Sequence, residues 1–261
     1  MLISLVKNDL RSSYRELFPL YLGLIIFASL SAISINYKVG LFSLFTVLPF
    51  IGLFVATIVI LIITIIKLFT ERLYSHEGYL VFTLPVSTLD IFLSKIITII
   101  VWVTVTILVY LLAVMIFCGI VVLINWGDFN ISFSDFLIDL RSISWSSVLL
   151  DTLRALAISL PQFIVSIAYA SALILLAVVF VNTSIVSKHK LVIAVVLYLV
   201  VSFIIGLPKV YIFGNWITTT SIHSINVEWL NYGINIIYYL LMTIGLIASS
   251  VWLNDHKLEL E

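Results

Sequence analysis

The chain has 261 residues, 63% of them hydrophobic and 10% charged, with a mean hydropathy of +1.27. A soluble core of this size cannot hide so much apolar surface, so the composition excludes an ordinary soluble protein and places the chain in a membrane. The formal net charge is zero and no long basic tract occurs, which excludes nucleic acid as a partner.

Long uncharged runs divide the chain into six predicted spans. Unpaired backbone groups are costly in lipid, so only helices or closed barrels can span, and these continuous runs lack the alternating pattern of barrel strands. The predicted fold is all-α, a polytopic membrane protein with one transmembrane domain over residues 1–261. The spans cover residues 18–36, 41–66, 91–124, 158–182, 191–207 and 232–253.

Residues 1–17, before the first span, favour an amphipathic helix lying in the membrane interface. The alternative is a simple extension of the first span into water. Apolar side chains recur at i, i+4 spacing and basic side chains lie on an adjoining face: Leu2, Val6, Leu10 and Tyr14, with Lys7, Arg11 and Arg15.

The third span is longer than a bilayer requires. A continuous helix over residues 91–124 extends about 51 Å, against a hydrocarbon core of about 30 Å. The helix must therefore tilt, break or project beyond the membrane. Lys95, near its start, is expected to extend its amine to the interface.

Residues 125–157 form the largest segment between spans and read as one or two amphipathic helices on the outer surface. Phe136 and Leu140 share one face, whereas Asp151 and Arg154 fall in a second helical piece. The segment is suited to shaping a substrate exit, receiving a partner or capping the bundle.

The distribution of Lys and Arg favours cytoplasmic termini, because basic residues accumulate on the cytoplasmic side. With this orientation nine basic residues lie inside and four lie outside. The inner set is Lys7, Arg11, Arg15, Lys67, Arg72, Lys95, Lys188, Lys190 and Lys257, and the outer set is Lys38, Arg141, Arg154 and Lys209.

Residues 68–90, between spans two and three, then lie on the cytoplasmic side and include the charged stretch "ERLYSHEG". Residues 70–76 can form two helical turns, which Gly78 is placed to end. Pro85 prevents a helix from running directly into the next span. The residues from Ser87 to Asp90 resemble a capping box that opens span three. The prediction is a short charged helix anchored by an apolar linker.

The segment "EGYLVFTLPVSTLDIFLSK" resembles ABC-2 type transporter permeases of Gram-positive bacteria, similar to exporters of peptides and phenol-soluble modulins. Their motif has an acidic residue, Gly-Tyr-Leu, Leu-Pro-Val-Ser and then a Lys. The matching residues are Glu77, Gly78, Tyr79, Leu80, Leu84, Pro85, Val86, Ser87 and Lys95. Over the rest of the chain the agreement is one of layout.

The resemblance implies a permease subunit of the bacterial plasma membrane, paired with a second permease and driven by a separate ATP-binding cassette subunit. The chain has no GxxxxGK[ST] loop, so ATP and Mg²⁺ would bind the partner, and this chain would carry neither a cofactor nor catalysis. The loop after span two would be a coupling helix that docks on the ATPase. Its predicted interface is Glu71, Arg72, Tyr74, His76, Glu77, Gly78 and Tyr79.

Several alternatives are open for the cargo and for the class of function. Few charges lie in the spans, which favours a lipophilic compound or amphipathic peptide over an ion or sugar. A permease for resistance to peptide antibiotics fits the same features. A stand-alone secondary transporter or channel, or a structural membrane protein, stays open. An intramembrane enzyme fits poorly because His76, His189, His223 and His256 lie outside the predicted spans.

Overall fold

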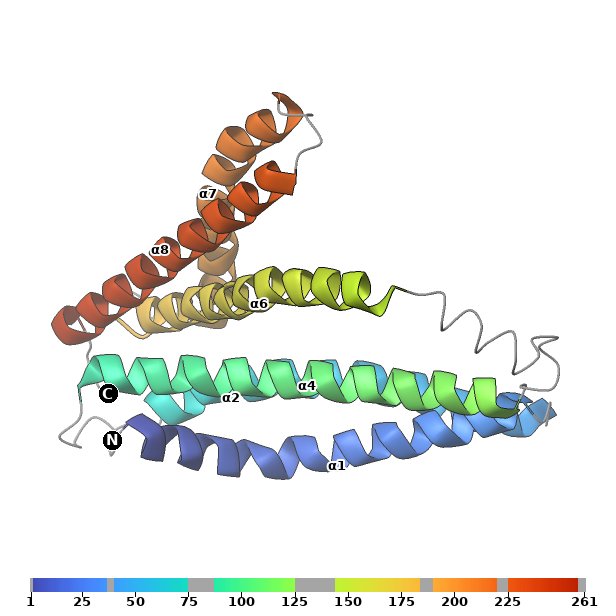
Figure 1. Cartoon of the computed structure of the whole chain (residues 1–261). Coiled ribbons are helices and arrows are strands. Elements are labelled where there is room, and N and C mark those ends of the chain that lie inside the picture. The colour runs from blue at the N-terminus through green and yellow to red at the C-terminus, as the bar shows by residue number, and fades with distance from the viewer. Residues whose placement is uncertain are drawn as a thin grey trace. The chain divides into compact units, whose positions relative to one another are not determined.

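The described part of the chain is entirely built from long helices (Figure 1). The computed structural model describes residues 2–36, 40–74, 87–124, 144–183, 190–219 and 225–257. The helices of these residues are α1 (Leu2–Asn36), α2 (Gly40–Tyr74), α4 (Thr88–Ile124), α6 (Trp145–Val181), α7 (Lys190–Thr219) and α8 (Ile225–Lys257).

Five of these helices are long and apolar enough to cross a membrane: α1, α2, α4, α6 and α8. The apolar section found in α7, Val192–Pro208, is shorter. The all-α, multi-pass membrane class predicted from the sequence is therefore confirmed, whereas the sixth span stays a prediction.

The helices extend beyond the predicted spans. Residues 2–17 and the first span form one helix, α1, without a break at position 17. Similarly, α6 begins at Trp145, so residues 145–157 continue directly into the fourth span. Residues 125–143 lie outside the described part. Among the three alternatives for the third span, a break is excluded, because α4 is continuous over 37 residues.

Proline lies inside several of these helices, including Pro19 of α1, Pro49 of α2 and Pro161 of α6. Each proline removes one backbone donor, which interrupts the hydrogen-bond ladder locally. Membrane helices tolerate this because neighbouring helices and hydroxyl side chains satisfy the freed carbonyl groups. These prolines therefore do not mark helix ends.

The chain divides into two compact units. Unit 1 comprises Met1–Lys7, Lys67–Ile100 and Ala155–Glu261, and unit 2 comprises Asn8–Ile66 and Val101–Arg154. Unit 1 thus holds the end of α2, the start of α4, most of α6 and all of α7 and α8. Unit 2 holds most of α1 and α2 with the second part of α4.

In unit 2, α1, α2 and α4 pack around buried apolar side chains. One cluster contains Leu17, Tyr21 and Trp102, and another contains Leu24, Ala28 and Ala113. The buried positions of α1 recur every three or four residues from Asp9 to Ser34, so one face of the helix is covered along most of its length. Tyr14, on the apolar face predicted for an interfacial helix, is exposed.

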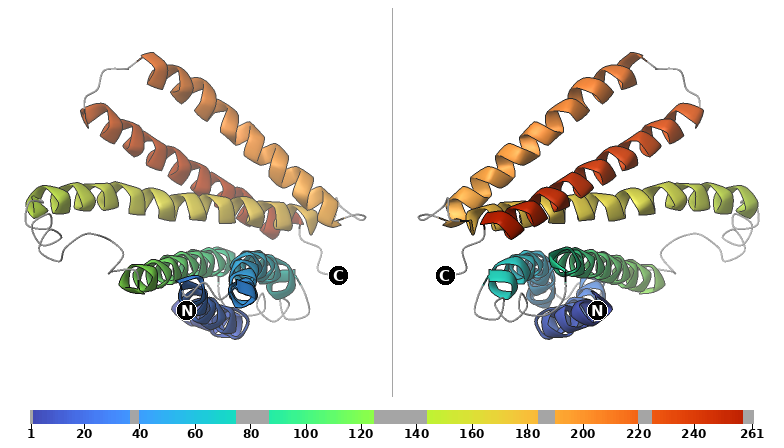
Figure 2. Two further views of the ribbon diagram at one scale, coloured as in Figure 1. Left: turned by 90° about the vertical axis from the view of Figure 1, so that its right-hand side faces the viewer. Right: turned by 90° about the vertical axis from the view of Figure 1, so that its left-hand side faces the viewer.

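In unit 1, α7 and α8 meet the C-terminal part of α6 (Figure 2). The buried cluster joins Ile96 of α4, Ala172 and Leu173 of α6, and Leu246 of α8. Tyr169 and Tyr198 pack against this cluster, and the ring of Tyr169 lies 5.1 Å from that of Tyr239 between centroids. Aliphatic and aromatic side chains therefore form the contacts among these helices.

Candidate coupling region

Two helix ends in unit 1 lie before and after residues 75–86. We call these two ends, residues 67–74 and 87–100, the candidate coupling region, because the predicted docking residues lie in and between them. The first is the end of α2, where Leu68, Phe69 and Leu73 are buried, with 3%, 0% and 0% of their surface exposed. No Gly or Pro interrupts residues 67–74, and Lys, Leu, Glu and Arg are good helix formers. The helix consequently continues past Lys67 instead of ending there.

The structure places Glu71, Arg72 and Tyr74 in the last turn of α2. The sequence predicted a separate short helix, and this part of the prediction is wrong for these three residues, because they prolong the second long helix. His76, Glu77, Gly78 and Tyr79 lie outside the described residues, as does Pro85. The structure therefore brings together the first three predicted docking residues and describes none of the other four.

The second helix end, the start of α4, is capped by Ser87. The Ser87 Oγ accepts a hydrogen bond from the backbone N–H of Asp90 at 3.2 Å. The Ser87 carbonyl accepts from the backbone N–H groups of Asp90 and Ile91 at 3.0 and 3.2 Å. Asp90 places an acidic side chain in the first turn, where the helix dipole favours negative charge. The predicted helix start at Ser87, with its side chain as the cap, is confirmed.

The first turns of α4 are buried on most sides. Ile91, Phe92 and Ile96 have at most 4% of their surface exposed. Hydroxyl groups in these turns are satisfied within the helix: Ser94 donates to the Ile91 carbonyl at 2.7 Å, and Thr98 donates to the Ser94 carbonyl at 2.8 Å. The helix can thus be enclosed by other protein segments without leaving these hydroxyls unpaired.

Lys95 lies within these buried turns, with only 4% of its surface exposed, and has an interaction partner. The sequence predicted that its amine reaches the membrane interface, but the structure encloses the side chain in protein. A charged amine in an apolar region is costly unless it is paired. Lys95 is therefore a buried residue of the candidate coupling region with an interaction partner, and the one other charged residue of α4 is Asp90.

Asp9 is a second buried charged residue, and the sequence analysis did not single it out. It is 5% exposed, has an interaction partner, and precedes Ser13 and Leu17 on the covered face of α1. The signal in the sequence was its i, i+4 spacing to these two positions. The basic residues near Asp9 in the sequence lie on the opposite, exposed side of the helix.

Among the residues that the structure describes, no group of three or more His, Cys, Asp and Glu side chains could hold a metal ion. What the candidate coupling region offers is two helix ends, each fixed by buried side chains, on either side of residues 75–86.

No family model, curated protein or solved structure matches the chain. The resemblance over residues 77–95 therefore depends on those residues alone. Of its nine matching positions, the structure describes Ser87, which caps α4, and Lys95, which is buried.

Proposed function

We propose that the chain is the membrane-spanning permease subunit of an ATP-binding cassette exporter in the bacterial plasma membrane. Both termini face the cytoplasm in this proposal, and a separate subunit binds and hydrolyses ATP with Mg²⁺. The chain pairs with a second permease subunit. It moves amphipathic peptides or lipophilic compounds out of the cell, and resistance to peptide antibiotics is one use of the same activity.

One observation carries the proposal: the segment with the permease motif joins two long apolar helices, and the adjoining end of each is firmly held. At the end of α2, Phe69 and Leu73 are fully buried. At the start of α4, Ser87 caps the helix and Lys95 is buried. A docking segment between fixed helix ends transmits displacement, whereas one between loose ends would absorb it. Glu71 and Arg72, in the last turn of α2, supply charge for an ATPase surface.

The composition of the helices supports the choice of cargo. The part of α2 from residue 40 to 66 carries no charged residue, and α4 carries only Asp90 and Lys95. An ion or sugar crossing such helices would lose its water without gaining polar partners. A cargo that is itself partly apolar avoids that cost.

The test is reconstitution with the ATPase of the same host. Glu71→Arg and Glu77→Arg should each weaken binding of the ATPase and reduce the stimulation of ATP hydrolysis by the permease, because they reverse charge at the proposed contact. Asp255→Arg is the matched control, because Asp255 is an exposed acidic residue near the end of α8. It should leave both measurements unchanged.

Two results would contradict the proposal. One is transport by the purified chain in liposomes without nucleotide or ATPase, which would indicate a stand-alone transporter or channel. The other is equal loss of binding in the Glu71, Glu77 and Asp255 variants, which would indicate a general charge effect and no specific docking surface.

A further inference from the structure

Buried hydroxyl groups follow one pattern in the described residues, and Ser13 of α1 is the exception. Thirteen buried Ser and Thr residues lie in the described ranges, and twelve of them donate to a backbone carbonyl three or four residues earlier in the chain. Ser13 is 1% exposed, and its Oγ has no hydrogen-bond partner. Ser13 therefore holds a buried hydroxyl that its own helix does not satisfy.

The indole nitrogen of Trp102 in α4 is a second enclosed polar atom. Trp102 is 9% exposed, and its Nε1 has no hydrogen-bond partner. An indole N–H can only donate, so it needs an acceptor. Burying such a donor unpaired is unfavourable, and most buried polar side-chain atoms are paired with protein or with ordered water. The two unpartnered atoms have one explanation if they lie in the same place.

The packing of unit 2 brings Ser13 and Trp102 together. Trp102 forms a buried cluster with Leu17 and Tyr21, and Leu10 packs against this cluster. Leu10 and Leu17 are seven residues apart, about 10.5 Å along the helix axis, which is too far for direct contact, and Tyr21 lies further still. Leu10 must therefore contact Trp102. The indole spans α1 from the level of Leu10 to that of Leu17, and the buried Ser13 lies between these two levels.

Rearrangement of protein atoms alone would satisfy only one of the two groups. Rotation of the Ser13 hydroxyl toward its own helix would pair the hydroxyl but leave the indole N–H without an acceptor. The nearby Tyr21 hydroxyl is already engaged, because it lies 2.6 Å from the Thr106 hydroxyl. The remaining side chains that pack against the cluster are aliphatic: Leu10, Ile60, Leu61, Val105 and Val109. An added oxygen atom is what both groups require.

We propose that a single water molecule binds between the Ser13 hydroxyl and the Trp102 indole. Its oxygen accepts from the indole N–H, and one of its protons goes to Ser13 Oγ, so that both buried groups are paired. Residues that are only 1% and 9% exposed leave no route for a larger ligand. An ion would need charged partners, and the side chains of this cluster are uncharged.

The bound water adds a polar link between α1 and α4. The Tyr21–Thr106 hydrogen bond joins the same two helices, and Thr106 lies one turn after Trp102. A water-mediated hydrogen bond is nearly as favourable as a direct one, so polar links on successive turns of α4 would align the two helices. This site involves neither ATPase nor cargo, and its failure would leave the proposed function unaffected.

The first experiment measures whether Ser13 and Trp102 act together. The equilibrium constant of unfolding in mixed micelles is measured for Ser13→Ala, Trp102→Phe and the double variant. With the water bound, Ser13→Ala should raise this constant several-fold in the wild-type chain but change it little in the Trp102→Phe chain. Comparing the two backgrounds cancels the packing lost with the smaller ring. Ser31→Ala is the matched control, because Ser31 is buried in α1 and donates to the Ala28 carbonyl. Its effect should be the same in both backgrounds.

The second experiment detects the water by NMR of the chain in nanodiscs with ¹⁵N-labelled tryptophan. The Trp102 indole proton should show a cross-peak to a long-lived water. Trp102→Phe assigns this signal by removing it, and Ser13→Ala should weaken it. If Ser13→Ala is as stable as the wild type or more stable in both backgrounds, Ser13 is simply unpaired and the proposal is overturned. Coupling between the two residues without a water cross-peak would also overturn it, because the two groups would then bond directly.

Discussion

The two units of the molecule hold their helices together with similar kinds of contact, but direct bonds between the hydroxyl groups of two helices are found in unit 2. Unit 2 has two hydroxyl–hydroxyl hydrogen bonds between helices, Tyr21 with Thr106 and Ser34 with Thr46, both at 2.6 Å. The Tyr110 hydroxyl also donates to the backbone carbonyl of Phe54 at 2.9 Å. Unit 1 also has a bond of the last kind, from the Tyr238 hydroxyl to the Ile205 carbonyl at 2.5 Å. Ring contacts occur in both units, such as Tyr169 with Tyr239 in unit 1 and Phe54 with Tyr110 in unit 2. Directional bonds fix how one helix is aligned along another, whereas ring contacts tolerate small displacements.

This difference bears on how the proposed permease would move. The candidate coupling region belongs to unit 1, where helices would have to shift when the ATPase moves. Unit 2, whose helices are locked in register by hydroxyl groups, is suited to act as a fixed frame. The comparison can be tested by removing one kind of contact at a time from each unit.

The largest expected effects come from cavities in the two cores. Leu24→Ala in unit 2 and Leu173→Ala in unit 1 remove side chains that are 0% and 2% exposed. Each should lower the free energy of unfolding by about 2 to 3 kcal/mol, because packing is lost on all sides. The measurement is reversible unfolding in mixed micelles. Leu241→Ala, at a position 63% exposed, is the control and should change little.

Removing a tyrosine hydroxyl should separate the two units more sharply. The Thr106 hydroxyl donates to the Trp102 carbonyl at 2.8 Å, so the proton between Tyr21 and Thr106 comes from Tyr21. Tyr21→Phe leaves the Thr106 oxygen without this donor and should cost about 1 kcal/mol of unfolding free energy. Tyr169→Phe keeps its ring contact with Tyr239 and should cost much less. Equal losses would argue against the difference between the units.

The sequence was sufficient to predict the class of fold because charge and apolarity mark membrane spans directly. It was less informative about helix ends. Glu71 and Arg72 are charged and end a hydrophobic run, but they are also good helix formers, so α2 continues through them. The same holds at residue 17, where the hydropathy of the sequence changes but no residue prevents α1 from continuing. Hydropathy reports where a helix leaves lipid, not where it stops.

The candidate site was predictable only in part. Ser87 could be recognised because a cap depends on neighbouring residues in the sequence, and the structure has that cap. The burial of Lys95 could not, because it depends on which helices surround the start of α4. A lysine near the end of a span has two possible environments, the interface or a protein interior, and only tertiary packing decides between them.

The two serine caps give a smaller test of local structure in the two units. Ser87 accepts from the Asp90 backbone N–H in unit 1, whereas the Ser144 hydroxyl in unit 2 interacts with the Ser147 hydroxyl. Ser87→Ala should therefore destabilise the start of α4 by about 1 kcal/mol, and Ser144→Ala should destabilise α6 by less. Hydrogen exchange of the first-turn amides measures both. A larger increase in exchange at the start of α6 on Ser144→Ala than at the start of α4 on Ser87→Ala would contradict this order.

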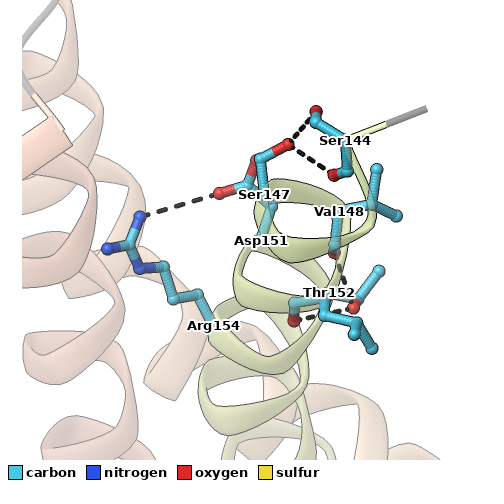
Figure 3. Close-up of polar contacts among 7 residues, drawn as sticks. Ser144, Ser147, Val148, Asp151, Thr152 and Arg154 are labelled. Carbon is cyan, nitrogen blue, oxygen red and sulfur yellow. Dashed lines mark hydrogen bonds and ion pairs between the residues drawn. The ribbon is translucent and has the colours of Figure 1, made fainter. Parts of the chain in front are cut away.

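The smallest expected effect concerns the ion pair between Asp151 and Arg154 in the first turns of α6 (Figure 3). Asp151 and Arg154 are 3.6 Å apart, but their side chains are 74% and 60% exposed. Asp151→Asn should change the free energy of unfolding by no more than about 0.5 kcal/mol, because water and salt screen an exposed pair. The same measurement at low and high salt should give nearly equal values for the variant. A loss as large as that of Tyr21→Phe would mean that the pair is enclosed, either by a second copy or by another partner.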